Sequence, residues 1–273
     1  MSIRLIALDL DGTTLNHEGK LPEANRAAFA EAFKKNAAVV VCTGRALQTV
    51  PKELLEVDEI RYFITSNGAR IIDRKLGRDL YQSFLSPAAV RILPELIEKY
   101  DLKLEVFRDG QAHIEKSVFE DVKDGKTMQA RRKYVMETRK PVENLSSYIK
   151  EHPDDIENVN VVFDDLDELE RMRPILESIP DARITQSFRN NLEIGGPDAS
   201  KGKALEHLLE ELGLSRSELL ACGDALNDLP MIRLAGIGVA MGNAWDPVKE
   251  EADYVTSSND DAGVAEAIRK FVL

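Results

Sequence analysis

The first part of the chain alternates short apolar runs with segments of helical spacing. The apolar runs are Ile3 to Leu8, Ala37 to Cys42 and Tyr62 to Thr65. Runs of this length that end in polar or glycine residues are typical of strands buried on both faces. Between them, residues 22–35 and 46–56 place apolar side chains at helical spacing. We therefore predict strand–helix–strand–helix–strand, the opening of a doubly wound, Rossmann-like parallel α/β sheet.

The middle of the chain has a different pattern, in which one strand candidate is followed closely by another. Asp109-Gly110 separates two such candidates and is a strong signal for a tight hairpin. A polar, helix-prone stretch at 117–150 then precedes a second strand–helix–hairpin pattern. The expected elements are helix 87–100, strands 102–108 and 111–116, strand 159–163, helix 166–178, and strands 182–188 and 191–195. We predict that residues 85–196 form an inserted, mixed α/β domain.

From Lys201 onward the first pattern returns. A helical segment at 201–212 ends at Gly213, and an apolar run at 218–222 leads into Gly223-Asp224. Helix 226–234 is followed by the glycine-containing segment Gly236 to Ala240, and the remaining expected elements are a short strand near 254–255 and a helix at 261–271. Residues 1–84 and 197–273 should therefore form one discontinuous core domain, interrupted by the insert.

Composition and charge narrow the possible functions. The 273 residues are 43% hydrophobic and 31% charged, which fits a folded globular protein. The formal net charge of −12 disfavours a nucleic-acid partner, because affinity for phosphate backbones depends on clustered lysine and arginine. No apolar run could cross a bilayer, and the first residues do not have the layout of a signal peptide. We expect a cytoplasmic protein with no membrane partner.

The cysteines and histidines point to neither a disulfide nor a zinc site. Cys42 and Cys222 end two apolar runs, and in the expected strand order the first strand lies between them. Two strand spacings exceed the reach of a disulfide, so we predict that these thiols do not pair. The four histidines are scattered without the spacing of zinc ligands.

The most informative polar segment is Asp9-Leu10-Asp11-Gly12-Thr13, directly after the first apolar run. A chain that leaves a strand and turns through Gly12 can direct both carboxylates into one site. Two converging carboxylates repel each other, so they need a cation or a shared proton. They are suited to Mg²⁺ binding, with one carboxylate as nucleophile and the other as acid/base. Alone, however, an Asp-Gly pair after a strand is also an ordinary turn.

Three further segments follow apolar runs or begin a helix. Thr43-Gly44-Arg45 offers a hydroxyl and backbone amides suited to phosphoryl oxygens. Lys201 stands in the first turn of a helix, where the helix dipole disfavours a cation unless an anion is near. Gly223-Asp224-Ala225-Leu226-Asn227-Asp228 could complete a Mg²⁺ site. Each segment alone has a simpler interpretation: a turn, a surface lysine and a helix cap.

Taken together and in this order, the four segments resemble the motifs of phosphatases of the haloacid dehalogenase (HAD) superfamily. Three more segments resemble its Cof-type branch: Thr65-Ser66-Asn67-Gly68-Ala69, Gly238 to Ala244 and Ala252 to Thr256. That branch has a cap domain between the second and third motifs, where the insert is found. One local departure is Asp261-Ala262-Gly263, at a place where the branch usually has an Asp-Gly pair.

The resemblance implies a Mg²⁺-dependent phosphatase that acts on small phosphorylated metabolites, such as sugar phosphates or coenzyme phosphates. Asp9 is then the nucleophile and Asp11 the acid/base. Mg²⁺ would be held by Asp9, the backbone carbonyl of Asp11 and Asp224, with Asp228 orienting these ligands or bound water. The expected phosphoryl-binding groups are Thr43, the amides of Leu10 and Gly44, Lys201 and Asn227.

Two other functions remain open at this point. A sugar phosphomutase or phosphotransferase would use the same nucleophile, and a non-catalytic phosphosugar-binding sensor would need only the binding groups. For the choice of substrate we consider the turn Phe188-Arg189-Asn190 in the cap, with Arg189 and Asn190 as specificity candidates.

Overall fold

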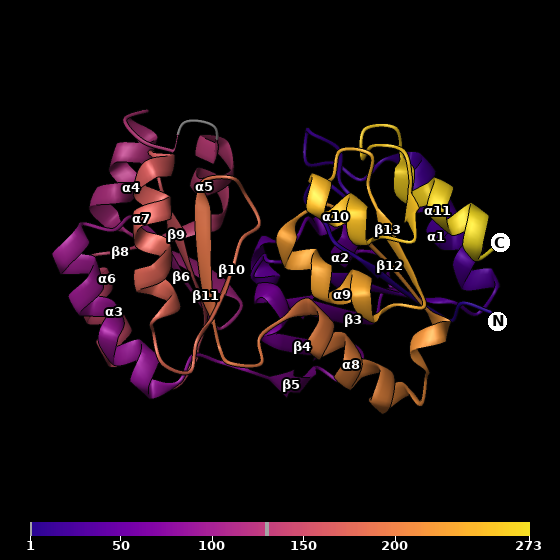
Figure 1. Ribbon diagram of the computed structural model, residues 1–273, viewed down its shortest axis with the longest axis horizontal. Coiled ribbons are helices and arrows are strands. Elements are labelled where there is room, and N and C mark those ends of the chain that lie inside the picture. Colours follow the sequence, from indigo (N-terminus) through magenta and orange to yellow (C-terminus); the bar gives the residue numbers. More distant parts are fainter. Residues whose placement is uncertain (1, 129–130) are drawn as a thin grey trace. The chain divides into compact units, whose positions relative to one another are not determined.

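The computed structural model describes residues 2–128 and 131–273 and divides the chain into two units. The core unit comprises Met1–Gly44, Val50–Gln82 and Ser200–Leu273; the cap unit comprises Arg45–Thr49 and Ser83–Ala199. Each unit contains one sheet and its own helices (Figure 1). Arg45–Thr49 belongs to the cap unit through contacts such as the hydrogen bond from the Gln48 amide to the Gly110 carbonyl at 2.9 Å.

The core unit is built on an eight-stranded sheet in the order β14-β13-β12-β1-β2-β3-β4-β5. Neighbouring strands are parallel from β14 to β3, and β4 and β5 add an antiparallel edge. The central strands are almost wholly buried, as expected for parallel strands with helices on both faces. The strands are β1 Leu5–Leu8, β2 Ala38–Cys42, β3 Tyr62–Thr65, β4 Arg70–Asp73, β5 Arg78–Gln82, β12 Leu219–Gly223, β13 Ile237–Ala240 and β14 Tyr254–Val255.

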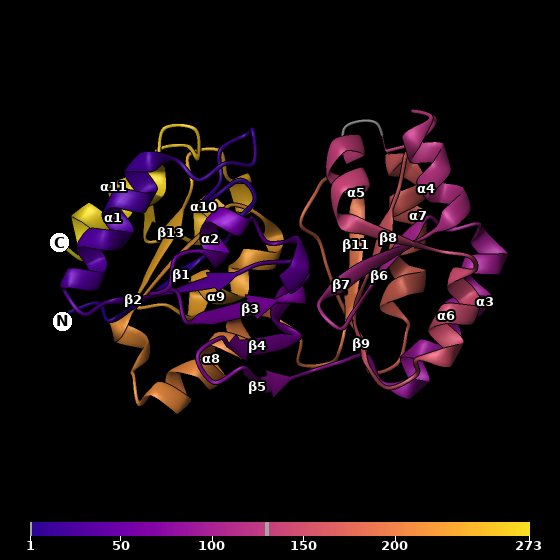
Figure 2. The same ribbon diagram turned by 180° about the vertical axis from the view of Figure 1, so that it is seen from behind.

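Helices α8 and α9 lie on one face of this sheet, and α1 and α11 lie together on the other (Figures 1 and 2). On the first face, Leu205 of α8 belongs to the same apolar core as Leu5 of β1. The Ser200 hydroxyl caps α8 by accepting from the Lys203 amide at 3.1 Å, which leaves Lys201 in the first turn. The helices are α1 Glu23–Lys34, α2 Lys52–Leu55, α8 Lys201–Leu212, α9 Leu229–Leu234, α10 Asp246–Glu251 and α11 Gly263–Phe271, with 3-10 turns η2 Ser66–Gly68, η4 Arg216–Glu218 and η5 Leu226–Asp228.

The cap unit has a six-stranded sheet in the order β10-β11-β9-β6-β7-β8. Helices α3, α6 and α7 pack on one face of it through an apolar core. The strands are β6 Leu104–Arg108, β7 Gln111–Glu115, β8 Arg139–Val142, β9 Ile156–Val162, β10 Arg183–Thr185 and β11 Asn191–Gly195. The helices are α3 Pro87–Tyr100, α4 Lys116–Lys123, α5 Arg132–Thr138, α6 Leu145–Glu151 and α7 Leu166–Glu177, with a 3-10 turn η1 at Leu47–Thr49.

An ion pair is buried on the cap sheet. Arg139 donates through Nε and Nη2 to the two Glu105 carboxylate oxygens at 2.9 and 2.7 Å, and neither side chain is more than 1% exposed. Burial acts to raise the pKa of Glu105, but the guanidinium groups of Arg139 and Arg131 outweigh it and lower that pKa to about 2. Asn160 adds a hydrogen bond to Glu105 at 2.8 Å. The carboxylate therefore stays ionised despite its burial.

The predicted fold class, a parallel α/β core with an inserted α/β domain, is confirmed. The hairpin predicted at Asp109-Gly110 joins β6 to β7, and both turn residues have positive φ, 51° and 68°. Strand β1 lies between β2 and β12. Cys42 and Cys222 are therefore two strands apart, as predicted, and both thiols are free.

Other expectations were wrong in detail. Strands β4 and β5 were not predicted, because their sequences mix charged and apolar residues at the edge of the core sheet. Strand β8 lies inside the stretch 117–150 that we expected to be helix-prone. It contains Pro141, which an edge strand can accommodate because one side of it needs no ladder bonds. The helix expected at 46–56 is divided into η1 and α2 at Pro51, which has no amide hydrogen to donate.

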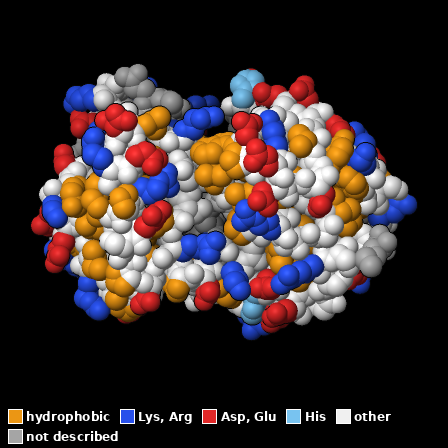
Figure 3. Space-filling view, in the orientation of Figure 1, with side chains coloured by type: hydrophobic (Ala, Val, Ile, Leu, Met, Phe, Trp, Pro, Cys, Tyr) orange, Lys and Arg blue, Asp and Glu red, His pale blue; other side chains and the backbone are white. Residues whose placement is uncertain are grey.

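Two surface properties bear on the expected partners. Among the residues that the structure describes, no helix has both the length and the apolar character needed to span a membrane. Acidic and basic side chains are interspersed over the face of the core unit shown in Figure 3, rather than gathered by sign. An interspersed pattern of this kind is typical of a solvated surface.

Candidate active site

The polar segments identified in the sequence follow neighbouring strands of the core sheet. Asp9 follows β1, Thr43 follows β2 and Asp224 follows β12. Because β2, β1 and β12 are adjacent and parallel, their carboxyl ends meet at one edge of the sheet. This edge is where ligands bind in open α/β sheets.

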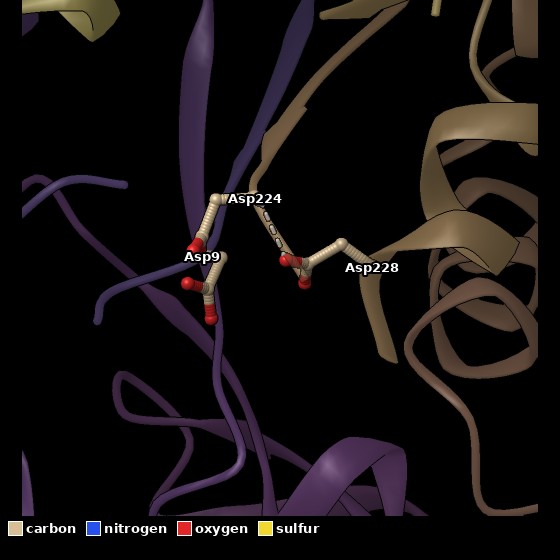
Figure 4. A group of neighbouring side chains, drawn as sticks. All are labelled: Asp9, Asp224 and Asp228. Atoms are coloured by element: carbon tan, nitrogen blue, oxygen red, sulfur yellow. Dashed lines mark hydrogen bonds between the residues drawn. The ribbon is translucent and has the colours of Figure 1, made fainter. Parts of the chain in front are cut away.

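Three carboxylates converge at this edge. Asp9, Asp224 and Asp228 each place one oxygen within 4.8 Å of the others, and Figure 4 shows the three side chains directed toward one another. Asp9 is 5% exposed and Asp228 is fully buried. Burial, with repulsion from neighbouring carboxylates, raises the pKa of both Asp9 and Asp224 well above the usual range, although Lys201 acts in the opposite direction. We call these three residues the aspartate cluster.

Lys201 supplies the cation that partly balances the aspartate cluster. Its Nζ lies 2.6 Å from Oδ1 of Asp9 and 2.6 Å from Oδ1 of Asp228, and its side chain is fully buried. Burial acts to lower the pKa of Lys201, but Asp228 and Asp9 outweigh it and raise that pKa. Among the described residues, one ammonium faces three carboxylates, so the site needs a further cation or a shared proton.

Backbone turns and short hydrogen-bonded contacts hold the cluster in place. The Thr13 hydroxyl donates to Asp224 Oδ1 at 3.0 Å. Asp228 Oδ2 accepts from the amides of Asp224 and Ala225 at 2.9 and 3.0 Å. Gly12 has φ +78°, and a Cβ on it would lie 2.4 Å from Asp224 Oδ2. Only glycine allows the Asp9–Thr13 turn to approach Asp224 so closely.

The remaining predicted site residues lie in different surroundings. The Asp11 carboxylate is outside the aspartate cluster and half-buried, but its charge contributes to the raised pKa of Asp9. Three of the predicted phosphoryl-binding residues are buried near the strand ends that carry the aspartate cluster: Leu10, Thr43 and Asn227. Gly44 directly follows Thr43.

The two specificity candidates lie in the turn between β10 and β11 of the cap unit. Asn190 donates from its amide to the Phe163 carbonyl at 3.1 Å, whereas Arg189 is exposed. Phe188, the first residue of the turn named in the sequence, has the Arg131 guanidinium 5.4 Å above its ring.

Two asparagines of the Cof-type segments, to which the sequence pattern gave no role, lie at this edge of the sheet. Asn67 accepts a hydrogen bond from Asn227 at 3.0 Å. Asn243 donates to the Gly12 carbonyl at 2.8 Å. For Asn67, the available signal was a polar segment directly after β3, which neighbours β2 in the sheet.

Comparison with known proteins identifies the family. The model of the haloacid dehalogenase-like hydrolase family matches residues 6–268. The chain belongs to this family. The resemblance inferred from the four motifs is thus confirmed, and the protein is an enzyme, a phosphatase of the HAD superfamily.

Its relatives match along nearly the whole chain. The 5-amino-6-(5-phospho-D-ribitylamino)uracil phosphatase YcsE of Bacillus subtilis is 35% identical, with 100% of this chain and 97% of that protein covered. The B. subtilis phosphatase YwpJ is 30% identical over 98% of this chain and 99% of its own. A solved haloacid dehalogenase-like hydrolase from B. subtilis has a TM-score of 0.86 at 28% identity, covering 98% of this chain and 99% of its own.

Proposed function

We propose that this HAD phosphatase is Mg²⁺-dependent and hydrolyses small phosphorylated metabolites through an aspartyl-phosphate on Asp9. One observation supports this most strongly: among the described residues, two buried carboxylates and the half-buried Asp224 converge on one ammonium group, at the carboxyl ends of parallel strands. Such a cluster is costly unless a cation shares it, and it offers a nucleophile where a phosphoryl group can reach.

The donor set fits Mg²⁺, which prefers carboxylate and carbonyl oxygens. We assign Asp9, the Asp11 backbone carbonyl and Asp224 as its ligands. Asp228 is better suited to orienting them, because Lys201 occupies its Oδ1 and two backbone amides occupy its Oδ2. When bound, Mg²⁺ would offset the negative charge that the carboxylates and the phosphoryl group share.

In the proposed reaction, an Asp9 carboxylate oxygen attacks phosphorus, and the bond from phosphorus to the leaving oxygen breaks. Asp11 gives its proton to that oxygen. It then takes a proton from the water that attacks the aspartyl-phosphate, which releases phosphate and restores Asp9. The Asp11 side chain can serve both steps because it lies outside the aspartate cluster, near enough to influence the Asp9 pKa.

The phosphoryl group would be held by donors at the same sheet edge. We assign this role to the Thr43 hydroxyl, the amides of Leu10 and Gly44, Lys201 and Asn227. These groups are N–H or O–H donors that follow β1, β2 and β12 or begin α8. Donors fixed by a sheet edge before substrate arrives stabilise developing negative charge without a cost of reorganisation.

For the substrate we propose a sugar phosphate or a coenzyme phosphate, whose sugar or coenzyme hydroxyl is the leaving group. The relative at 35% identity is named for a phosphoribitylamino-uracil, a phosphorylated sugar-alcohol derivative. In the cap unit, Arg189 and Asn190 stay our specificity candidates, and Arg189 is exposed. The Asn190 side-chain amide donates to the Phe163 carbonyl at 3.1 Å.

The proposal is tested by measuring phosphate release from sugar phosphates, coenzyme phosphates and nucleotides with Mg²⁺ and with EDTA. We expect release that requires Mg²⁺, is lost in Asp9→Asn, and passes through an acid-stable, hydroxylamine-sensitive phosphoenzyme. Full activity in EDTA, or in Asp9→Asn, would contradict the mechanism. Transfer of ³²P to a second sugar instead of water would show a phosphotransferase or mutase.

A further inference from the structure

The turn η2, Ser66–Gly68, has an unusual backbone. Ser66, Asn67 and Gly68 all have positive φ, at 51°, 57° and 92°. For non-glycine residues this conformation costs roughly 1 kcal/mol or more each, so it persists only where the surroundings impose it. The contacts of this turn show what those surroundings are.

The turn contacts the segment that follows β2. The Asn67 amide donates to the Thr43 carbonyl at 3.1 Å. The Asn67 side chain lies against Gly44, where a Cβ would be 3.1 Å from Oδ1 and 3.4 Å from Nδ2. Asn67 therefore lies directly over the backbone of Thr43-Gly44, which we assigned to the phosphoryl group.

The same turn contacts two other phosphoryl-binding segments. Gly68 packs against the start of α8, where a Cβ would lie 2.3 Å from the Ser200 carbonyl oxygen and 3.0 Å from the Lys201 amide nitrogen. On the other side, Asn227 Nδ2 donates to Asn67 Oδ1 at 3.0 Å. The turn thus contacts residues of the second, third and fourth motifs.

One part of this arrangement is unsatisfied. Asn67 is 2% exposed, yet its Nδ2 has no hydrogen-bond partner; Asn227 is 6% exposed, and its Oδ1 has none. A buried polar group left this way costs about 1–3 kcal/mol. Exchanging O and N in both amides keeps the single bond between them and leaves an unpaired NH₂ group on Asn227 instead. In the orientation of the structure, the unpaired donor is the Asn67 NH₂ group, which lies beside Gly44.

We infer that Asn67 is a further phosphoryl-binding residue. Its NH₂ group donates to a phosphoryl oxygen, and its carbonyl oxygen orients the Asn227 amide. A phosphoryl group is the fitting partner because it has only acceptor oxygens and the neighbouring Thr43, Gly44 and Lys201 offer only donors to it. This inference rests on the proposed function and adds a residue to the same site.

The test uses two variants and a matched control pair. Asn67→Asp keeps the shape but replaces the donor with a carboxylate that repels phosphate. Asn67→Gly removes the amide and accepts the positive φ without strain. Asn36 is an exposed asparagine with φ 60°, so Asn36→Asp and Asn36→Gly repeat the same changes far from the sheet edge.

The measurements are KM for p-nitrophenyl phosphate, the inhibition constant of inorganic phosphate and the Mg²⁺ concentration for half-activation. We expect Asn67→Asp to raise KM and the phosphate inhibition constant at least tenfold, and Asn67→Gly to raise both severalfold. Half-activation by Mg²⁺ should stay within twofold, and both Asn36 variants should match wild type. A general structural defect would not separate phosphate affinity from Mg²⁺ activation in this way.

Two results would overturn the inference. The first is that the wild-type enzyme is active and that Asn67→Gly has a KM and a phosphate inhibition constant within twofold of the wild-type values. The other is a parallel loss of phosphate and Mg²⁺ affinity in that variant. If Asn67→Asp does not fold, as judged by circular dichroism, Asn67→Gly decides alone. A wild type that releases no phosphate from any substrate would instead remove the proposed function, and this inference with it.

Discussion

Replacing Asp9 with asparagine should stop turnover and yet stabilise the core unit of the metal-free protein. Asparagine has nearly the shape of aspartate but lacks its charge and its nucleophilic oxygen. In wild type, burial is the main cause that raises the pKa of Asp9 from 3.8 to about 7, opposed by Lys201 and assisted by Asp228. The ionised carboxylate is therefore less stable in the folded protein than in the unfolded chain.

The size of the effect follows from this pKa. An acid whose pKa rises on folding contributes no penalty below its unfolded pKa, and its penalty grows as the pH rises to the folded pKa. A shift from 3.8 to about 7 is roughly three units, and each unit is worth about 1.4 kcal/mol. The upper limit at pH 8 is thus about 4 kcal/mol. Because local relaxation reduces such penalties, we expect Asp9→Asn to gain about 2 kcal/mol there and almost nothing near pH 4.

The assay uses the single tryptophan as a probe of the core unit. Trp245 belongs to this unit, and its amide donates to the Asp224 carbonyl at 2.9 Å. Urea unfolding followed by its fluorescence, in EDTA at several pH values, gives the free energy of unfolding. Asp58→Asn, at an exposed site, is the matched control. Adding Mg²⁺ should stabilise wild type more than Asp9→Asn, since binding to the folded state adds to stability.

Two outcomes would refute this reasoning. The first is a lower unfolding free energy for Asp9→Asn than for wild type at pH 8 in EDTA. The second is a gain that does not grow with pH, since the proposed cause is ionisation of Asp9. Separately, phosphate release near the wild-type rate in this variant would exclude Asp9 as the nucleophile.

Three further predictions concern other parts of the chain. In Asp11→Asn, phosphorylation of Asp9 by a sugar phosphate should slow far more than phosphorylation by p-nitrophenyl phosphate, because the sugar alkoxide needs a proton to leave and nitrophenolate does not. Rapid-quench kinetics that show equal losses for both substrates would contradict this. Glu105→Gln should cost about 3 kcal/mol at neutral pH by leaving Arg139 buried without its charge partner. It should also reduce the wild-type loss of stability as pH falls from 4.5 to about 2, by the share that comes from Glu105, as measured by calorimetry. Ala262→Gly should stabilise the core unit by about 1 kcal/mol in urea unfolding, since Ala262 has φ 56°.

The sequence was sufficient for the parts of the fold that depend on local pattern. Buried parallel strands need continuous apolar runs, and these located β1, β2, β3 and β12. The hairpin after β6 was predictable because Asp109-Gly110 suits two residues of positive φ. Strands β4, β5 and β8 were not, because an edge strand tolerates charges and proline and so resembles a loop in the sequence.

In the site, the sequence could predict the position of Asp9 but not the contacts of Asp228. Asp9 and Asp224 could be brought together from the sequence because their strands are neighbours with parallel carboxyl ends. That Asp228 has both oxygens occupied, by Lys201 and by backbone amides, follows only from the three-dimensional arrangement of α8 and η5. The role proposed for Asp228, orienting the proposed Mg²⁺ ligands, came from the resemblance to the family. Its contacts with Lys201 and the two backbone amides give a physical reason for that role.

Asn67 shows where sequence reasoning stops. Its bond to Asn227 joins residues 160 positions apart, and its position depends on a turn whose positive φ values the sequence does not predict. A polar residue after β3 could equally be a solvated turn. Asn67 differs from a solvated turn because it is buried and has an unpaired amide donor beside Gly44. Both properties appear only in the folded structure. A buried, unsatisfied and strained group persists only where something offsets its cost, and the donors around Asn67 are arranged for an anion, which the Asn67 amide would bind with them.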